Sequence, residues 1–413
     1  MNKYGLLGEK LSHSYSPIIH KELGDYPYEL VEVKPEDFEN FMDALPYSGL
    51  NVTIPYKKAV IPYCDEMSEA AKAIGSVNTI IRREDGVLYG DNTDAIGFLH
   101  LLKMRNIEAK GKKALILGSG GSSLTVHHVL KNEGAKEIIT VSRHGEHNYD
   151  NIHQHHDAQI IVNTTPVGMY PNNGKSPVSL KPFQSLEGVV DLIYNPDKTA
   201  LLLEANMLSI PSIGGLPMLV AQAAAAAQVF TNAEVTSEKI DKIVSKIRKQ
   251  TQNVVLIGMP GSGKSTIGRE VATLMDRPFI DTDREVETLA DKTIPEIFAE
   301  EGEAVFRDLE AQAIIKAGAV SGTIISTGGG AITRPENYAP LVQNGIIVFI
   351  ERPLKKLERK GRPLSGGDLE KLLEQRLPLY EQFADYQVAN TGEIHDVALD
   401  VLQLFYDSIN SAI

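Results

Sequence analysis

The chain has 413 residues, 42% of them hydrophobic, and a formal net charge of −13 at pH 7. This length exceeds the usual size of one domain and predicts two or three domains. The acidic balance argues against nucleic acids and membranes as partners, although a few arginines gathered in one pocket would still bind a small anion. The only cysteine, Cys64, excludes an intramolecular disulfide and a cysteine-rich metal cluster.

No stretch of the sequence predicts a transmembrane helix. The most apolar one, residues 218–230, is too short to cross a bilayer and follows Pro217, which favours a buried helix. The first residues lack the basic and then apolar layout of a secretory signal. We therefore expect a cytoplasmic enzyme, and the sequence leaves open whether it forms a homo-oligomer.

Strands and helices alternate along the first part of the chain. Apolar residues recur with helical spacing at residues 35–45, 68–75, 122–135 and 236–250. Strands are predicted at residues 28–33, 49–55, 112–117, 137–143, 158–169 and 188–196. Such a βαβ series predicts a parallel sheet with right-handed crossovers.

Polar residues near the start of the chain suit a small polyhydroxylated or anionic ligand. Ser12, Ser14 and Ser16 form a group of hydroxyls. Lys57 and Asp94 lie near two predicted strand ends, and a lysine with an aspartate near a nicotinamide predicts proton transfer beside hydride transfer. The alternative for this pair is a surface ion pair worth about 0–1 kcal/mol. Further polar candidates in this region are Asn51, Thr53, Asn78 and Asp91.

A glycine-rich turn follows the predicted strand 112–117. Gly118 and Gly120 fit the dinucleotide-binding pattern G-x-G-x-x-G, Ser123 replaces the third glycine, and an ordinary glycine turn is the alternative. The next strand ends at Arg143, where an NAD site would carry an acid, and an arginine suits the 2′-phosphate of NADP. The predicted NADP contacts are Gly118, Ser119, Gly120, Gly121, Ser122, Ser142 and Arg143.

A histidine-rich segment follows Arg143 and raises the question of a metal site. Its histidines are His144, His147, His153, His155 and His156. No set of cysteines or carboxylates completes a coordination shell around them. We therefore favour a solvated loop or a poorly formed helix at the edge of the cofactor domain.

A second glycine loop, GMPGSGKST, spans residues 258–266 and fits the P-loop pattern G-x-x-x-x-G-K-[ST]. A buried strand precedes it and a helical pattern follows, so an ordinary glycine turn is a weak alternative. In such a loop the backbone N–H groups wrap the β-phosphate, Lys264 reaches the β- and γ-phosphates, and Ser265 ligates Mg²⁺. The loop predicts a nucleoside triphosphate and phosphoryl transfer.

The acceptor site for that phosphoryl group must come from residues after the loop. Aspartates follow a strand, a run of glycines ends another strand, and arginines lie on helical segments or in a polar segment resembling a lid. Taken singly, these features are also explained by solvated ion pairs and a tight turn. The candidates are Asp281, Asp283, Arg307, Glu310, Gly328–Gly330, Arg362 and Arg376.

The motifs GSGKST, DTD, FRDLE, TGGG, RPL and RLPLY, in this order, resemble shikimate kinase over nearly all of the chain after Gln252. The resemblance implies that Arg307 and Arg376 clamp the shikimate carboxylate, with Gly329 beside them, and that Asp283 orients the 3-hydroxyl. It also implies that Asp281 supports the Mg²⁺ shell of Ser265. The implied nucleotide contacts are Gly261, Ser262, Gly263, Lys264, Ser265, Thr266 and Arg362.

One departure from the kinase family concerns the lid. Arg359 and Arg362 lie close together, and the segment after them is more polar than the apolar run of the family. The residues that contact adenine therefore stay open.

The motifs SHSYSP, NVTIPYK, SVNT, GDNTDAIG, NTTPVGM and GLPMLVAQAA resemble shikimate dehydrogenase over about residues 1–249. The resemblance implies that Lys57 is the general acid–base, assisted by Asp94, and that Ser14 and Ser16 bind the substrate carboxylate. The implied contacts of the substrate hydroxyls are Asn51, Thr53, Asn78, Asp94 and Gln222. Near the cofactor the resemblance implies Tyr194, on the substrate side, with Gly215 and Met218.

The sequence thus predicts an α/β chain with two nucleotide sites. We expect a substrate-binding domain at 1–100 and 213–249, a Rossmann NADP domain at 101–212, a linker at 250–253, and a P-loop domain of the nucleoside-monophosphate-kinase type at 254–413. The expected function is reduction of 3-dehydroshikimate to shikimate with NADPH, then phosphorylation to shikimate 3-phosphate with ATP and Mg²⁺. The alternative is a shikimate or quinate dehydrogenase whose ATP-binding domain is regulatory and not catalytic.

Overall fold

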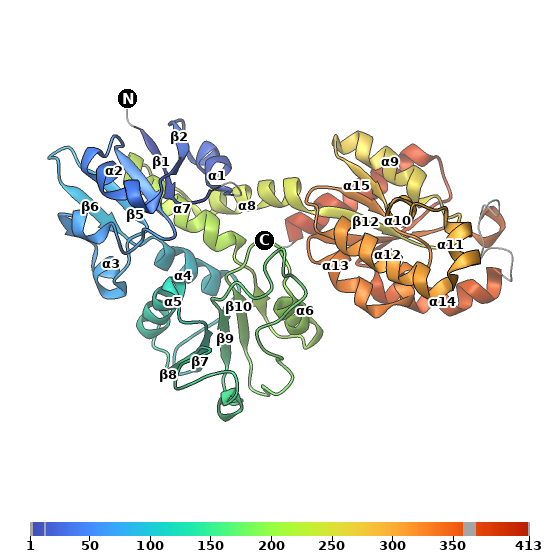
Figure 1. Ribbon diagram of the computed structural model, residues 1–413, viewed down its shortest axis with the longest axis horizontal. Coiled ribbons are helices and arrows are strands. Elements are labelled where there is room, and N and C mark those ends of the chain that lie inside the picture. The colour runs from blue at the N-terminus through green and yellow to red at the C-terminus, as the bar shows by residue number, and fades with distance from the viewer. Residues whose placement is uncertain (1–2, 12–13, 358–368, 412–413) are drawn as a thin grey trace. The chain divides into compact units, whose positions relative to one another are not determined.

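The chain is described by a computed structural model, which covers residues 3–11, 14–357 and 369–411 (Figure 1). It divides into two compact units, one of Met1–Met169 with Lys175–Val244 and the other of Tyr170–Gly174 with Ser245–Ile413. The division falls inside helix α8 (Ser237–Thr251). The predicted linker 250–253 covers the end of α8 and the first residue of strand β12 (Asn253–Ile257).

The first sheet has six strands in the order β2-β1-β3-β5-β6-β4. Its strands are β1 (Tyr4–Gly8), β2 (Tyr28–Glu32), β3 (Gly49–Val52), β4 (Glu66–Met67), β5 (Thr79–Arg82) and β6 (Leu88–Asp91). Strands β5 and β6 were not predicted, and β5 departs from the expected parallel series by running antiparallel to both β3 and β6. The cause is a tight hairpin between β5 and β6, in which Gly86 has φ of +89° and Arg83 N–H donates to Val87 O at 2.9 Å.

Helices α1 (Ser16–Leu23), α2 (Phe38–Ala44), α3 (Glu69–Ile74), α4 (Asp94–Met104) and α7 (Leu216–Thr231) belong to the same unit. Helix α3 begins where the sequence predicts it, because the Ser68 hydroxyl caps it by accepting from Ala71 N–H at 3.1 Å. Helices α4 and α7 pack closely at Gly97, where a side chain would collide with the backbone of α7. That contact fixes the start of α4 against the predicted substrate residues of α7.

The second sheet has five parallel strands in the order β11-β10-β9-β7-β8. They are β7 (Lys113–Leu117), β8 (Glu137–Val141), β9 (Ile160–Asn163), β10 (Gly188–Asp191) and β11 (Ser212–Ile213), with helices α5 (Gly121–Asn132) and α6 (Ala200–Met207). Between β8 and β9 the histidine-rich segment forms turns and a short 3-10 helix, η3 (Ile152–His155). The sheet is the Rossmann type that the glycine turn predicts.

The third sheet, in the second unit, has five parallel strands in the order β13-β14-β12-β15-β16. Besides β12 they are β13 (Phe279–Asp281), β14 (Ile324–Ser326), β15 (Gly345–Glu351) and β16 (Tyr386–Ala389). The helices are α9 (Lys264–Met275), α10 (Thr282–Ala290), α11 (Ile294–Glu300), α12 (Gly302–Gly318), α13 (Tyr338–Val342), α14 (Leu369–Phe383) and α15 (Ile394–Ser411).

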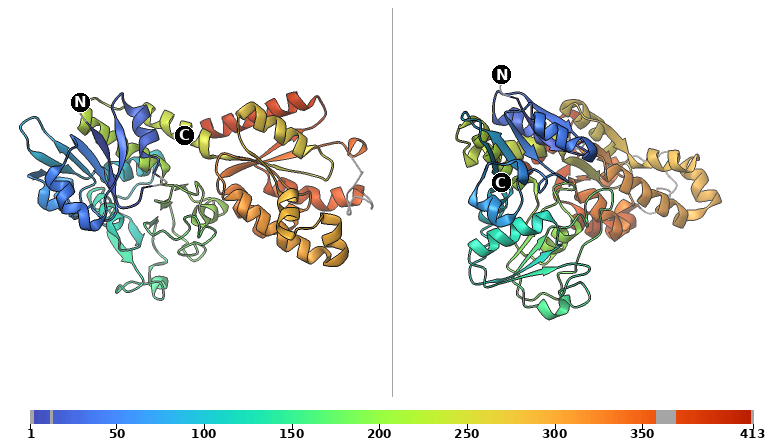
Figure 2. Two further views of the ribbon diagram at one scale, coloured as in Figure 1. Left: turned by 45° about the horizontal axis from the view of Figure 1, so that its top comes forward. Right: turned by 60° about the vertical axis from the view of Figure 1, so that its left-hand side comes forward.

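Helices α9 and α15 cover one face of this third sheet, and α12 and α13 lie on the other (Figure 2). Val254, Leu256, Val271 and Phe405 belong to one buried cluster that joins β12 to α9 and α15. The α/β class with parallel sheets is therefore confirmed. Within the described part of the chain, no helix has the length and apolar character needed to cross a bilayer.

Gly97→Ala is expected to destabilise the first unit. A Cβ at Gly97 would lie 2.7 Å from Met218 O and 3.1 Å from Gln222 Cβ, so α4 and α7 must move apart. Overpacking of this kind costs about 1–3 kcal/mol. Hydrogen exchange of the full chain, resolved by peptide, should show faster opening of α4 and α7 and an unchanged third sheet.

The matched control is Gly121→Ala at the start of α5, where a Cβ meets no atom within 4 Å. This variant should exchange like the wild type. Equal exchange of α4 in the two variants would contradict the packing argument.

Candidate active sites

The first unit contains a cavity of about 570 Å³. Its wall joins residues from the first sheet, from α4 and α7, and from the start of α5. The predicted site residues that line it are Ser14, Ser16, Asn51, Thr53, Lys57, Asn78, Asp94, Ser122, Tyr194, Gly215, Met218 and Gln222. The fold thus brings together side chains that lie as far as two hundred positions apart in the sequence.

Lys57 and Asp94 form an ion pair in this wall. The Lys57 Nζ donates to Asp94 Oδ2 at 2.6 Å, and the two side chains are 25% and 15% exposed. Asp94 is the first residue of α4, so its carboxylate lies at a helix N-terminus. A lysine held in this way can deliver a proton to an oxygen in the cavity while the carboxylate keeps its ammonium group in place.

Two buried amides form the polar floor of the cavity. Asn51 Oδ1 accepts from the Tyr28 hydroxyl at 2.7 Å, and Asn78 Oδ1 accepts from Thr93 N–H at 2.8 Å. The Asn51 Nδ2 also donates to Thr79 Oγ1 at 3.2 Å, so one of its two N–H donors is left for a ligand hydroxyl, and Asn78 likewise offers its amide nitrogen. The sequence reasoning missed Tyr28, because only the pairing of β1 with β2 and β3 brings it near Asn51.

The turn between β7 and α5 has the features of a phosphate cradle. Gly118 has φ of +106°, and a Cβ there would lie 2.8 Å from Thr164 Oγ1, so a glycine is required. A Cβ on Gly120 or Gly121 would meet nothing within 4 Å, which leaves open space at the N-terminus of α5. The Ser123 hydroxyl, in the third position of the pattern, closes the turn by donating to Gly120 O at 2.6 Å. This geometry fits an anion bound by backbone N–H groups.

The other predicted cofactor residues lie around this turn. Ser119 is part of the turn itself, and Ser142 and Arg143 follow β8, the strand next to β7. Arg143 is exposed, and the Ser142 N–H donates to His147 O at 3.0 Å. Neither residue lines the large cavity.

The histidine-rich segment contains one close pair. The His155 Nε2 and His147 Nδ1 atoms are hydrogen-bonded at 3.0 Å. Among the residues with described positions, no three histidines, cysteines, aspartates or glutamates converge as metal ligands. The segment therefore gives no support to a metal site.

A buried carboxylate, Asp191, ends strand β10 just before cavity residues Leu192 and Tyr194. It accepts from Asn163 Nδ2 at 3.0 Å, from Ile193 N–H at 3.1 Å and from the Thr199 hydroxyl at 2.7 Å. Burial raises the pKa of Asp191 to about 6, and these three hydrogen bonds oppose the rise. The carboxylate ties the ends of β9 and β10 to the wall of the cavity.

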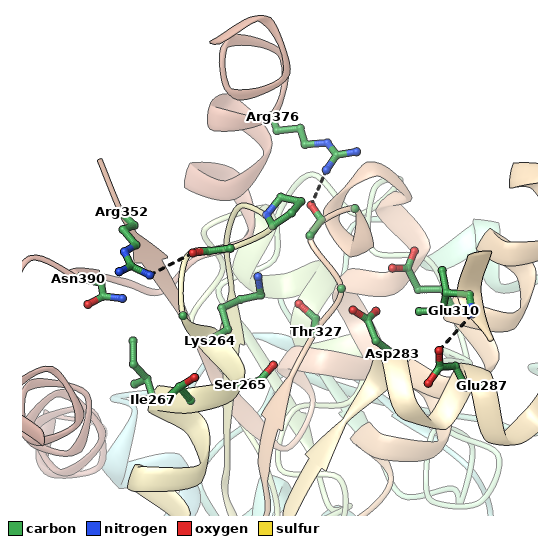
Figure 3. A pocket seen from close by; sticks show the side chains of 18 of the residues that line it. Lys264, Ser265, Ile267, Asp283, Glu287, Glu310, Thr327, Arg352, Arg376 and Asn390 are labelled. Carbon is green, nitrogen blue, oxygen red and sulfur yellow. Dashed lines mark hydrogen bonds between the residues drawn. The ribbon is translucent and has the colours of Figure 1, made fainter. Parts of the chain in front are cut away.

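The second unit has a cavity of about 450 Å³ around the P-loop (Figure 3). Gly258, Gly261 and Gly263 have φ of +148°, +81° and +95°, which only glycine adopts readily. The Lys264 Nζ donates to Gly258 O at 2.8 Å and to Met259 O at 3.0 Å. The predicted nucleotide residues in the wall are Gly261, Gly263, Lys264, Ser265 and Thr266.

Two predicted residues, Ser262 and Asp281, do not line this cavity. The Ser262 side chain is buried, and Asp281 caps α10 by accepting from Asp283 N–H at 3.2 Å. Arg362 and its neighbour Arg359 lie outside the described residues. The residue that contacts Ser265 is Ser326, with the two hydroxyl oxygens 3.2 Å apart. The sequence reasoning missed Ser326, which ends β14, the strand next to β12.

The remaining predicted residues gather on the far side of the P-loop. Asp283, Arg307, Gly329 and Arg376 line the cavity, and the Arg376 Nη1 donates to Gly329 O at 3.0 Å. Arg307 Nη1 donates to Glu310 Oε2 at 2.7 Å, and both side chains are buried. Burial raises the pKa of Glu310, while the neighbouring guanidinium of Arg307 opposes that rise.

The fold and these sites define two classes in one chain: a dinucleotide-dependent oxidoreductase unit and a P-loop phosphotransferase unit. Residues 6–80 match the shikimate dehydrogenase substrate-binding domain, and residues 260–405 match shikimate kinase. The chain belongs to the shikimate dehydrogenase family and carries a shikimate kinase domain after it.

Known relatives cover the first unit. The NADP(+) shikimate dehydrogenase of Clostridium perfringens is 36% identical over 270 residues, which is 60% of this chain and 99% of the relative. The crystal structure of shikimate dehydrogenase 1 from Peptoclostridium difficile is 38% identical, with a TM-score of 0.55 over 60% of this chain and 98% of that one. The Thermus thermophilus enzyme, solved with NADP(H) and shikimate, is 30% identical, with a TM-score of 0.55 over 60% and 99% of the two chains.

The stability of the first unit should fall with rising pH because of Asp191. Its pKa is raised from the ordinary value of 3.8 to about 6 in the folded chain, so the folded state holds this proton more tightly than the unfolded state. The contribution is fully present below pH 4 and is lost as the pH rises through 6, by about 2–3 kcal/mol.

The measurement is urea unfolding of the first unit at several pH values, followed by pulsed hydrogen exchange in β9 and β10. The matched variant Asp191→Asn cannot titrate. As the pH rises from 4 to 6.5, the free energy of unfolding of the wild type should therefore fall relative to that of the variant. A difference that does not change with pH would refute the argument.

Proposed function

We propose that the chain is a bifunctional enzyme that makes shikimate and then phosphorylates it. The first unit reduces 3-dehydroshikimate with NADPH, and the second transfers a phosphoryl group from ATP, with Mg²⁺, to the 3-hydroxyl of shikimate. One observation carries the proposal: each unit has its own glycine turn, and each turn lies beside a cavity with the polar residues that its reaction needs. The family membership of both parts supports it.

In the first cavity, residues of the chain hold the substrate and move a proton. NADPH supplies the hydride for the 3-keto carbon. The ammonium group of Lys57 gives a proton to the developing alkoxide. The Asp94 carboxylate holds this ammonium group in place and accepts a hydrogen bond from a substrate hydroxyl. Ser14 and Ser16 bind the carboxylate, and the amides of Asn51, Asn78 and Gln222, with the Thr53 hydroxyl, bind the hydroxyls.

The cofactor of this unit is NADP(H). The backbone of the turn at 118–121 binds the pyrophosphate, and the exposed Arg143 with Ser142 receives the 2′-phosphate. At the end of β8 there is no acidic residue that would accept hydrogen bonds from the ribose hydroxyls of NAD. Tyr194, Gly215 and Met218 enclose the nicotinamide end where substrate and cofactor meet.

In the second cavity the residues of the chain position the two substrates and neutralise the charge on the phosphates. ATP supplies the phosphoryl group, and Mg²⁺ balances its charge. The backbone of residues 261–266 and the Lys264 ammonium group hold the phosphates, while the Ser265 hydroxyl is the ligand that the chain offers to Mg²⁺. Asp281, which ends β13 and caps α10, is the carboxylate that we infer to support this metal shell from outside the cavity wall. Asp283 orients the acceptor hydroxyl and takes its proton.

The carboxylate of shikimate is clamped by two arginines, Arg307 and Arg376, with Gly329 between them and the P-loop. Glu310 is a positioning residue in this clamp. Its buried carboxylate accepts from Arg307 Nη1 at 2.7 Å, while the exposed Glu303 accepts from Nη2 at 3.1 Å, so the two carboxylates together restrict that side chain. A guanidinium suits this task because it binds a carboxylate in two parallel hydrogen bonds.

The chain acts on small molecules, and we propose that it does so in the cytoplasm. The lone cysteine suits a reducing compartment. The intact lysine, aspartate and arginines of the second cavity favour a catalytic kinase over a regulatory ATP-binding domain.

Two substitutions should separate the activities. Lys57→Ala removes the proton donor and should lower the dehydrogenase kcat about 10²- to 10⁴-fold, with the kinase unchanged. Lys264→Met removes the cation on the phosphates and should abolish phosphoryl transfer, with the dehydrogenase unchanged.

The measurement is one reaction containing 3-dehydroshikimate, NADPH, ATP and Mg²⁺, in which NADPH absorbance and ADP are followed together. Omission of either nucleotide is the control. A wild-type chain that binds ATP but forms no ADP from shikimate would show that the second unit is regulatory.

Glu310→Gln should weaken shikimate binding in the kinase. The amide keeps the size of the side chain but loses the charge that holds Arg307, and a hydrogen bond to a charged group is worth about 1.5–3 kcal/mol. We expect the KM for shikimate to rise at least about 10-fold, with the KM for ATP unchanged. Asp308→Asn is the matched control, because that carboxylate pairs with Arg334 outside the cavity. An unchanged KM for shikimate in Glu310→Gln would exclude this role.

A further inference from the structure

The wall of the second cavity continues past the P-loop, away from the arginine clamp. Figure 3 shows Ile267, Arg352 and Asn390 on one side of Lys264 and Ser265, and Asp283 and Glu310 on the other. Gly392 and Ile394 complete this end of the wall. These residues come from α9, from the end of β15 and from the segment after β16, and no sequence motif assigned any of them a role.

Arg352 is anchored to the outside of the P-loop. It follows directly after β15 and is half-buried, and its Nη1 donates to Gly261 O at 3.3 Å. Its Nε is buried and makes no hydrogen bond in the described structure. Figure 3 shows the Arg352 guanidinium across the loop from Lys264, so it lies beside the phosphate cradle that Lys264 faces.

Asn390, which follows β16, fixes the end of that strand against the P-loop. Its Nδ2 donates to Ser262 O at 2.7 Å, and its N–H donates to Glu351 O at 2.6 Å. The second bond ties the end of β16 to the residue that precedes Arg352. The backbone that carries Arg352 is therefore tied to the end of β16, and the guanidinium itself is held by Gly261 O.

The surfaces around Arg352 suit a flat aromatic ring more than a phosphate. Ile394 is apolar and 45% exposed beside the cavity, whereas Ile267 is fully buried in the core behind the wall. A Cβ on Gly392 would meet no atom within 4 Å, which leaves room at this wall. A guanidinium plane next to aliphatic side chains can stack on a heterocycle.

We infer that Arg352 is a positioning and specificity residue for the nucleotide of the kinase. Its guanidinium packs on the face of the nucleobase, with the exposed side chain of Ile394 beside the same ring. The base is thereby fixed at one end of the cavity while the P-loop holds the phosphates, so the terminal phosphate points toward Asp283. This inference rests on the proposed kinase function for its consequence in turnover, but binding alone tests the contact.

The test compares a nucleotide with its phosphate chain on the full-length protein. Calorimetry measures the Kd of ADP and of inorganic tripolyphosphate, each with Mg²⁺, for wild type, Arg352→Ala and Arg352→Lys. We expect both variants to bind ADP about 5- to 30-fold more weakly and tripolyphosphate as tightly as the wild type. Unchanged tripolyphosphate binding also shows that the P-loop unit of each variant is folded.

Three results would overturn the inference. If tripolyphosphate weakens in step with ADP, or if Arg352→Lys restores ADP binding, then Arg352 acts as a charge on the phosphates. If ADP binding does not change, then Arg352 does not touch the nucleotide. Arg334→Ala is the matched control, because this arginine of the same unit pairs with Asp308 and does not line the cavity.

Kinetics give the second readout. In both Arg352 variants the KM for ATP should rise by the same factor as the Kd of ADP, with the KM for shikimate and the dehydrogenase activity unchanged. A wild-type chain without shikimate kinase activity would refute the proposed function, whereas the ADP and tripolyphosphate titrations would still decide the role of Arg352.

Discussion

A tight glycine turn between a buried parallel strand and a helix is the constraint on which both sites depend. The strand end fixes where the turn begins, and the helix N-terminus directs backbone N–H groups and a favourable dipole at one point. The chain uses this arrangement twice, at β7–α5 and at β12–α9. In each case a glycine is required by a left-handed backbone, at Gly118 in the first turn and at Gly258, Gly261 and Gly263 in the second.

The two cavities differ in how they present polarity to one small acid. The first relies on neutral hydroxyls and amides that are held by buried partners, with a single lysine–aspartate pair for the proton. The second relies on guanidinium groups, one of them held by the buried Glu310. A redox site that must release a neutral alcohol needs little fixed charge, while a phosphoryl-transfer site must neutralise several anionic oxygens. The same ligand is therefore compatible with two unlike pockets.

The sequence predicts features that depend on residues close together in the chain, and it misses those that depend on residues far apart. Both glycine turns and the strands that precede them are local patterns, and the structure has them where they were expected. The antiparallel β5 was missed because its hairpin is signalled only by a short turn at Gly86. Tyr28, Ser326 and Arg352 were missed because each reaches its site through strand pairing across the sheet, which no local spacing records. Glu310 was visible at helical spacing from Arg307, but its burial, which gives it a positioning role, arises only from tertiary packing.

The central claim is that one chain holds two independent sites for the same acid. Equilibrium dialysis with labelled shikimate tests it most directly, with MgADP present and NADP⁺ absent so that neither reaction turns over. The account predicts saturation at two molecules of shikimate per chain, falling to one when Arg307 and Arg376 are both replaced by alanine. Saturation at one molecule in the wild-type chain would contradict it.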